Sequence, residues 1–381
     1  MIKDRAAIVG IGQTPFAKRL EPSEAALACQ AIKAALDDAG IDASEVDALS
    51  SYTMETNDEV QIARNVGFGD ITFFSQIGYG GGAGCATVGH LAMAIATGQA
   101  RVGVAWRSRK RGSGPRPWTN VAQQLPVPAQ WSRPWGLLRP ADEVGMLARR
   151  YMHEFGATRD HLANVALACR QHANRNPNAQ MFERPMTRED YMNARWIAEP
   201  LCLFDNCLET DGALACVIVS ADRAKDLAQP PVYVHAFAQS LPAQHQTMIN
   251  YFNDDPLKGP AWACSEQLWR GADFVPADVK VAQIYDAFTA LIPLSLEGYG
   301  FCERGEGAAF TEDGALELGG RLPINTSGGG LSEAYVHGFN LINEGVRQIR
   351  GTSTAQVPDA DTCLVTAGEG VPTSAMLLRG M

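Results

Sequence analysis

Short apolar runs alternate with longer amphipathic stretches along most of the chain. Residues 6–12, AAIVGIG, end at a glycine and precede Pro15, and this pattern predicts a buried strand. Ser23 then stands where a helix N-cap is expected, with apolar residues at helical spacing behind it. Residues 46–52 predict a second strand. The alternation of strands with helices predicts an α/β fold with mixed or parallel strands.

One sequence pattern, a glycine triplet followed by a helical stretch, occurs twice. The three glycines 80–82 precede a helical pattern over residues 83–96, and the three glycines 328–330 precede another over residues 331–347. Each pattern is followed by an apolar run that predicts a strand. We therefore expect two structurally related halves, each with a central helix that a glycine turn opens.

The boundary between the halves is predicted at the Pro-Pro pair that follows residues 207–224, where a strand would close the first half. This gives a first half over residues 1–225 and a second over residues 226–381. Residues from about 107 to 195 interrupt the first half with Pro-rich sequence and two helical patterns. We expect them to form an inserted loop region.

The composition is that of an ordinary globular enzyme, with 381 residues, of which 46% are hydrophobic and 19% are charged. A net charge of −10 argues against nucleic acid as the main partner. The nine cysteines are scattered with no CxxC pair, which indicates neither a zinc site nor a disulfide framework and predicts reduced thiols in the cytoplasm. We expect no signal peptide, and no apolar run approaches the roughly 18 residues of a membrane span.

A basic stretch opens the inserted region, with Arg107, Arg109, Lys110 and Arg111 among glycines and prolines. Such side chains could hold the phosphates of coenzyme A. A solvated basic loop, or a contact with an acidic partner subunit, fits the same residues.

Three segments resemble active-site segments of the thiolase superfamily, closest to its sterol-carrier-protein-X or lipid-transfer-protein branch. They are residues 77–98, 283–306 and 324–340. When the last two are registered on the family's motifs, Tyr285 and Tyr335 fall where that family places two catalytic histidines. The resemblance implies a thiolase-like fold, in which two duplicated βαβαβαββ-type halves form an αβαβα sandwich with an inserted loop domain that covers the coenzyme A site.

The cysteine of this chain also stands at a different position from the thiolase nucleophile. Thiolases carry a reactive cysteine at the start of a buried helix, and this chain has a Cys-Ala-Thr triplet there, at Cys85. Counted back from Gly98, the nucleophile position falls near Gly82 or Ala83, so the side chain of Cys85 turns in another direction. Because no histidine remains to activate a thiolate, Cys85 is expected to pack as a small apolar group.

Over nearly the whole chain, the sequence is similar to the thiolase-like steroid side-chain aldolases of bacterial sterol catabolism. The resemblance implies retro-aldol cleavage of a 17-hydroxy-3-oxo-pregnene-20-carboxyl-CoA to a 17-keto steroid and propionyl-CoA, with Tyr285 and Tyr335 as catalytic residues. It also implies a homodimer core with two partner chains, each with an OB-fold and a zinc ribbon and often fused to a MaoC-like hydratase. We expect no metal or cofactor in this chain itself; coenzyme A belongs to the substrate, and zinc to the partner.

A retro-aldol cleavage needs a base for the β-hydroxyl proton, an acid for the departing enolate, and donors to its oxygen. A tyrosine can be either if donors or positive charge lower its pKa from about 10. We expect Tyr335 nearest the reacting bond and Tyr285 as the second proton-transfer or oxyanion group, with base and acid unassigned. On the predicted helix, Glu333 and His337 each stand two residues from Tyr335, so at most one should face the same cavity. Further candidates for supporting or oxyanion roles are His337, Asp286, Gly368, Gly370 and Tyr251.

Two other functions fit the sequence. The chain could be a non-catalytic thiolase-like subunit that binds acyl-CoA and acts as a scaffold, or a true thiolase that uses Cys85. Each tyrosine could also be a packing residue whose hydroxyl meets a backbone carbonyl. The tryptophans at 118, 131 and 135 could line a steroid entrance or contact a partner.

Overall fold

The structure is a computed structural model that describes residues 2–53, 57–114, 127–244, 248, 250–369 and 373–380, without the side chains of residues 127–129. Its larger sheet is built from strands of both halves of the chain. The first half supplies β1 (Ala6–Gln13), β2 (Ala48–Tyr52), β3 (Phe73–Ile77), β4 (Val102–Lys110) and β7 (Asp211–Ser220). The second half supplies β8 (Val232–Ser240), β9 (Val281–Gln283), β10 (Thr362–Ala367) and β11 (Thr373–Arg379).

The two halves repeat one pairing pattern. In the first half, β2 runs parallel to β3 and β4, β4 is antiparallel to β7, and β7 is antiparallel to β1. In the second half, β9 runs parallel to β10, β10 is antiparallel to β11, and β11 is antiparallel to β8. A short antiparallel ladder between β1 and β8 joins the halves, so the order in the described residues is β3-β2-β4-β7-β1-β8-β11-β10-β9. This repeat confirms the predicted duplication.

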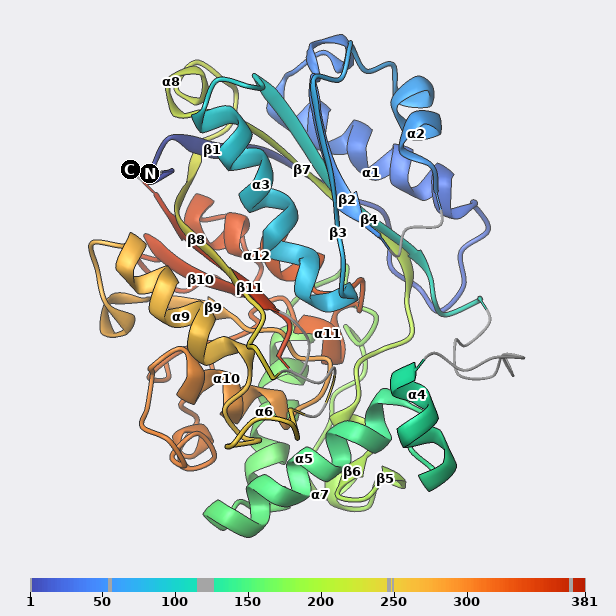
Figure 1. The fold of residues 1–381 in the computed structure, drawn as a ribbon, viewed down its shortest axis with the longest axis vertical. Helices are drawn as coiled ribbons and strands as arrows, with labels where there is room; N and C mark the ends of the chain where they lie inside the picture. Colours follow the sequence, from blue (N-terminus) through green and yellow to red (C-terminus); the bar gives the residue numbers. More distant parts are fainter. Residues whose placement is uncertain are drawn as a thin grey trace.

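Four helices complete the layers of the sandwich. Helix α1 (Glu24–Ala39) covers the outer face of β1, β4 and β7, and α9 (Pro260–Gly271) covers the outer face of β8 and β11. Between the halves, α3 (Gly84–Ala96) and α12 (Phe339–Arg350) contact each other and strands of both halves (Figure 1). Alternate residues of β1 point to the two sides: Ala7 and Val9 pack in the core with α1, and Ala6 and Ile8 pack in the central core.

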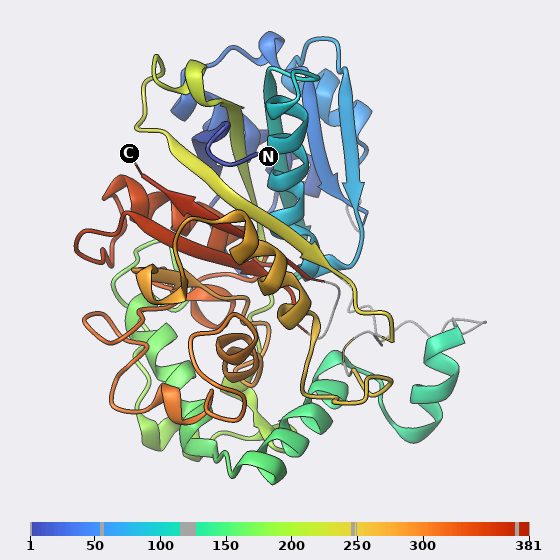
Figure 2. The ribbon, with the colours of Figure 1, turned by 60° about the vertical axis from the view of Figure 1, so that its left-hand side comes forward.

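The inserted region lies between β4 and β7 in the sequence and forms the lower part of the molecule in Figures 1 and 2. It contains α4 (Val127–Ser132), α5 (Pro140–Phe155), α6 (Arg159–Ala173), α7 (Arg188–Met192) and a small sheet of β5 (Trp196–Ala198) and β6 (Leu201–Cys202). The remaining short helices are α2 (Glu59–Val66), α8 (Ala221–Ala224), α10 (Leu291–Gly298) and α11 (Gly329–Ser332). None of the described helices is long and apolar enough to cross a membrane.

The local signals in the sequence account for most of these elements. The Ser23 hydroxyl accepts a hydrogen bond from the amide of Ala26 and caps α1, which ends at Gly40 in the left-handed conformation. The first glycine triplet opens a short 3₁₀ turn that leads into α3, as predicted.

The prediction of one helix over residues 331–347 is wrong. Two helices, α11 and α12, form there, and residues 333–338 between them are not helical. The cause lies in the backbone, because His337 and Gly338 have φ values of 50° and 76°, which a right-handed helix does not allow. The basic stretch is also not a loop from its start, since Arg107 to Lys110 are the last residues of β4.

Candidate active site

Tyr285 lies just after β9, at the inner end of the second half. Its backbone amide donates a hydrogen bond to the Thr366 hydroxyl of β10 at 2.9 Å. The side-chain amide of Asn325 both accepts from the amide of Ile284, at 2.7 Å, and donates to its carbonyl, at 2.8 Å. These bonds continue the sheet past the end of β9 and fix the backbone that carries the phenol.

Tyr335 lies in the non-helical segment between α11 and α12. Its amide donates to the Thr210 hydroxyl at 2.9 Å, and the Gly330 carbonyl upstream accepts from the amide of Leu208 at 2.9 Å. Both partners come from the irregular segment just before β7. The first half of the chain therefore holds the segment that presents Tyr335.

The two phenols meet directly. Their hydroxyl oxygens are 2.5 Å apart, and their rings are tilted by 54° with centroids 6.2 Å apart. Burial raises the pKa of both hydroxyls above 10. For Tyr335, a hydrogen bond from Tyr285 and the charge of Arg111 act in the opposite direction. The pair can therefore share and pass a proton, and Tyr335 is the member whose ionised form has donors and positive charge near it.

Two glycines make room for Tyr285. A Cβ atom at Gly81 would lie 1.9 Å from the Tyr285 hydroxyl, and one at Gly338 would lie 2.9 Å from a ring carbon. No side chain fits at either position without displacing the ring. Thiolases carry a nucleophile near the start of α3. In this chain, the phenol of Tyr285 lies against the bare backbone of Gly81 there.

His337, two residues after Tyr335, contacts it in an edge-on arrangement with ring centroids 5.5 Å apart. His337 is thus the one of the two flanking residues that meets Tyr335, in agreement with the prediction that at most one would do so, but residues 333–338 are not the helix which that prediction assumed. The Nδ1 atom of His337 lies 2.8 Å from a guanidinium nitrogen of Arg107, and that guanidinium lies over the ring of Tyr52. Burial lowers the pKa of His337 well below 6.5, and Arg107, Arg109 and Arg111 lower it further.

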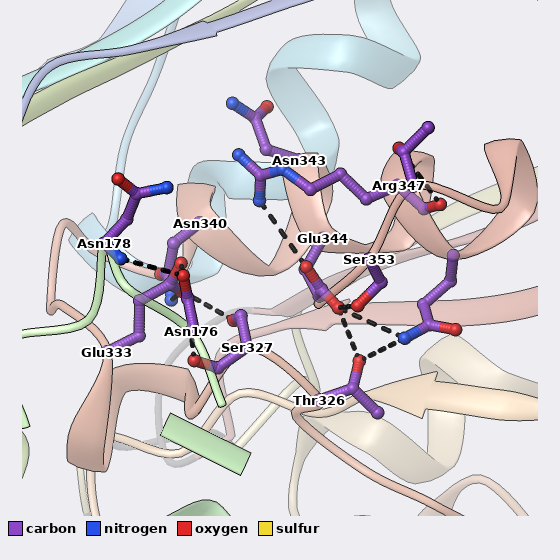
Figure 3. Close-up of polar contacts among 12 residues, drawn as sticks. Asn176, Asn178, Thr326, Ser327, Glu333, Asn340, Asn343, Glu344, Arg347 and Ser353 are labelled. Atoms are coloured by element: carbon purple, nitrogen blue, oxygen red, sulfur yellow. Dashed lines mark hydrogen bonds and ion pairs between the residues drawn. The ribbon is translucent and has the colours of Figure 1, made fainter. Parts of the chain in front are cut away.

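Glu333 does not face the tyrosine pair. Its carboxylate accepts hydrogen bonds from the Ser327 hydroxyl at 2.6 Å, the Asn340 amide at 2.8 Å and the Asn176 amide at 3.2 Å (Figure 3). Burial raises the pKa of Glu333 to about 7. Because Ser327 and Asn340 stand on either side of the segment that carries Tyr335, this carboxylate ties the two ends of the segment together.

The other supporting candidates have different positions. Asp286 is buried and accepts from the amides of Gly330 at 2.8 Å and Leu331 at 3.3 Å, so it fixes the glycine turn; burial raises its pKa to about 6. The Gly368 carbonyl accepts from the Thr373 hydroxyl, and no contact with the tyrosine pair supports an oxyanion role for Gly368 among the described residues. Tyr251 is half-buried near Arg150. Gly370 lies outside the described residues, and oxyanion or pocket roles for Gly368, Gly370 and Tyr251 stay predictions.

Cys85 is the second residue of α3 and is fully buried. Its thiol points to the Val365 carbonyl of β10, with sulfur and oxygen 3.4 Å apart. Burial raises its pKa well above 9, and two neighbouring cysteines, Cys264 and Cys363, add to this effect. The thiol is therefore protonated at neutral pH, as expected of a packing residue.

The four basic residues predicted to bind coenzyme A lie in different surroundings. Arg107 is buried behind His337, Arg109 lies 4.0 Å from a Glu24 carboxylate oxygen, and Lys110 donates to backbone carbonyls of the segment before α1. Arg111, in contrast, lines a cavity of about 930 Å³ between the first half and the inserted region. Coenzyme A contact stays a prediction for all four, and Arg111 has the position for it.

The lining of the cavity contains both cationic and apolar side chains. Phe288 and Leu331, close in sequence to the two catalytic candidates, belong to it, as does Cys207. Cys207 is near enough to raise the pKa of both Tyr285 and Tyr335. In the described lining, one carboxylate, Glu209, stands against six cations: Lys18, Arg111, Arg139, Arg170, Arg184 and Arg195.

Several of these residues were not predicted from the sequence. Thr210 and Asn325, which position the two phenols, lie in irregular segments where periodicity carries no information. The arginines of the inserted region are spread over residues 139–195, so they do not form a visible run. A polar residue shortly before a glycine turn, as at Asn325 three residues before Gly328, is the one signal that points to such a role.

Comparisons with known proteins show which family the chain resembles. The thiolase N-terminal domain model matches residues 6–222, and the thiolase C-terminal domain-like model matches residues 243–378. A 17-hydroxy-3-oxo-4-pregnene-20-carboxyl-CoA lyase from Mycobacterium tuberculosis is 50% identical over 99% of this chain and 100% of its own length. A steroid side-chain-cleaving aldolase from Thermomonospora curvata is 47% identical over 98% of this chain and 97% of its own.

A solved structure described as an Ltp2-ChsH2(DUF35) aldolase has the same fold, with a TM-score of 0.96 and 46% identity. It covers 100% of this chain, which covers 98% of that one.

Proposed function

The chain belongs to the thiolase family, in the branch of steroid side-chain-cleaving aldolases, and from this membership we propose that it cleaves the Cα–Cβ bond of a β-hydroxy acyl-CoA by a retro-aldol reaction. The proposed substrate is 17-hydroxy-3-oxo-4-pregnene-20-carboxyl-CoA, the compound named for the relative from Mycobacterium tuberculosis. The products are a 17-keto steroid and propionyl-CoA. The hydrogen-bonded pair of Tyr285 and Tyr335 is the observation that carries the proposal.

The reaction needs no net proton from outside. One proton leaves the β-hydroxyl as the carbonyl forms, and one proton reaches the α-carbon as the thioester enolate departs. Because burial keeps both phenols neutral, a pair that takes one proton and gives one is suited to this balance. The bond between Tyr285 and Tyr335 lets the two hydroxyls act as one relay, with the proton entering at one phenol and leaving at the other.

The cationic cavity is the proposed site for the phosphates of coenzyme A. Lys18, Arg184 and Arg195 are exposed in its lining and have no carboxylate within ion-pair distance in the described part of the chain. In a protein with a net charge of −10, such a group of cations indicates an anionic ligand. Cys207 is in the lining and is near both phenols, so we propose that an acyl-CoA with its phosphates at the arginines extends its thioester past Cys207 to the tyrosine pair.

We further propose that the enzyme works with a DUF35 partner, as the name of the solved aldolase indicates for that protein. The arrangement would be a heterotetramer with a homodimer core and two partner chains, each with an OB-fold and zinc ribbon and in some cases a MaoC-like hydratase. Trp131 and Trp135 are 76% and 82% exposed on the projecting α4 segment, and an apolar partner surface would cover them.

No metal or cofactor of its own is proposed for this chain. In the described residues, no group of three His, Cys, Asp or Glu side chains is placed to hold a metal ion. Zinc would belong to the partner's ribbon. We place the enzyme in the cytoplasm, because its nine cysteines are free thiols.

The proposal is tested with the partner present. The steroid thioester is incubated with wild type, Tyr335→Phe and Tyr285→Phe, and propionyl-CoA is measured by chromatography. Each variant keeps the ring and removes the hydroxyl, so we expect kcat to fall by about 10²- to 10⁴-fold. Equal release by wild type and both variants would remove the phenols from the mechanism, and no release by wild type would favour the scaffold function or another substrate.

A further inference from the structure

Five side chains form a contact group that contains the tyrosine pair. Tyr285, Tyr335 and His337 are in contact with one another through Tyr335 and keep 5%, 8% and 6% of their surface exposed. Tyr52 and Arg107, which contact His337, are 0% exposed. His337 is therefore the neighbour of the phenols that, like them, keeps a small exposed surface.

The contact with Arg107 fixes the state of the imidazole. A guanidinium nitrogen has hydrogens to donate and no lone pair to accept with, so at 2.8 Å the Nδ1 atom of His337 must be the acceptor. An imidazole that accepts at Nδ1 is neutral and carries its proton on Nε2. The contact with Arg107 occupies Nδ1 and leaves the Nε2–H as the donor that the ring can offer to another group.

Every charged group near the ring supports the neutral state. Arg107, Arg109 and Arg111 approach it from β4 and its end, and each opposes a second positive charge. The groups on the other sides are the neutral phenols of Tyr52 and Tyr335. His337 is thus a permanent donor rather than a proton acceptor.

We propose that His337 is a third catalytic residue, a neutral imidazole whose Nε2–H donates a hydrogen bond to the thioester oxygen as the enolate forms. Arg107 is the positioning residue that holds this tautomer. The inference rests on the proposed retro-aldol function and adds to it the group that stabilises the enolate oxygen, which neither phenol can do while both handle protons. No proton is transferred by His337, so the balance of the reaction is unchanged.

The first test compares His337→Gln with His337→Leu in the complex with the partner. The two replacements are similar in size, and glutamine keeps an N–H donor that leucine lacks. We expect the leucine variant to lose about 10²- to 10³-fold in kcat, the effect of removing one oxyanion donor, with little change in KM. The glutamine variant should stay within about tenfold of wild type. Equal kcat values for the two variants would overturn the proposal.

A second test separates donation from packing. His337→Ala leaves a space for an added heterocycle, and imidazole should restore kcat because it can accept from Arg107 and donate from its other nitrogen. The ligand 1-methylimidazole fills the same space, but its second nitrogen carries a methyl group, so it should not restore kcat. Equal rescue by both compounds would reduce His337 to a packing residue.

The role of Arg107 is tested through its dependence on His337. Arg107→Met should lower kcat in the wild-type background and cost nothing further in the His337→Leu background, and Arg107→Lys should recover part of the loss. A full additional loss in the double variant would show that Arg107 acts by another route. If wild type releases no propionyl-CoA at all, the proposed function fails first; an active wild type with an active His337→Leu variant sinks this inference alone.

Discussion

Replacing Gly81 by alanine should disable the enzyme through Tyr285. The new Cβ would lie 1.9 Å from the phenol oxygen and 2.2 Å from the ring carbon that carries it. Non-bonded contact of these atoms requires about 3.5 Å, so the ring tip must move by about 1.5 Å. The hydroxyl bond to Tyr335 is 2.5 Å long, and a displacement of that size breaks it.

The Gly81→Ala substitution is expected to lower kcat strongly. A misplacement of about 1 Å at a reacting group costs about 10²-fold, which corresponds to about 2.7 kcal/mol of activation free energy. Overpacking adds a stability cost of about 1–3 kcal/mol, so unfolding by urea is measured beside kcat.

Gly78→Ala is the matched control. It lies three residues upstream, and its new Cβ would have Thr53 Oγ1 as nearest neighbour, at 3.9 Å, which is ordinary contact. The control should keep wild-type kcat, and Gly81→Ala should not. Wild-type kcat in a folded Gly81→Ala enzyme would mean that the bond between the two phenols is not needed, and the relay would have to be abandoned.

Three further predictions concern groups at increasing distance from the phenols. Burial raises the pKa of Glu333 to about 7, against about 4.5 in the unfolded chain, so its ionisation costs up to about 3 kcal/mol of stability as pH rises through that window. Glu333→Gln lacks this loss, so the difference in unfolding free energy between variant and wild type, measured with urea at pH 5 and pH 8, should close or reverse by that amount. Parallel pH profiles of the two proteins would contradict this prediction. Arg184→Ala should raise KM for the thioester by about tenfold, or about 1.4 kcal/mol, with kcat kept. Lys225→Ala, directly after α8, should change neither, and an unchanged KM for Arg184→Ala would remove Arg184 from the phosphate site. Cys85→Ala should keep wild-type kcat and resistance to iodoacetamide, and loss of activity would revive the thiolase reading.

Much of the fold follows from local signals. The strand from Ala6, the cap at Ser23 and the helix that follows the first glycine triplet rest on patterns that a single segment contains. The duplication could be predicted because both copies kept the glycine triplet. The prediction of one helix over residues 331–347 was wrong because the chain breaks at His337 and Gly338, whose positive φ values no spacing of apolar residues reports.

The active site, like the fold, could be predicted from the sequence only in part. Tyr285 and Tyr335 could be named from their registration on family motifs, and the structure adds that their hydroxyls touch. The bond from Arg107 to His337 joins residues 230 positions apart, and no periodicity or spacing reports such a pair. Arg107 was assigned to a phosphate loop because its neighbours are basic, yet its place in β4 turns it into the interior.

The shared pairing pattern of the two halves has a consequence for how this active site arose. Both phenols and the imidazole come from the second copy, at Tyr285, Tyr335 and His337, and the first copy contributes a bare glycine at Gly81 and a buried charge at Arg107. After a gene duplication, this arrangement lets one copy change its reacting side chains while the other keeps the residues that surround them. New chemistry on this scaffold then requires substitutions in one half and only accommodation in the other, which helps a single architecture to move from acyl transfer to carbon–carbon cleavage.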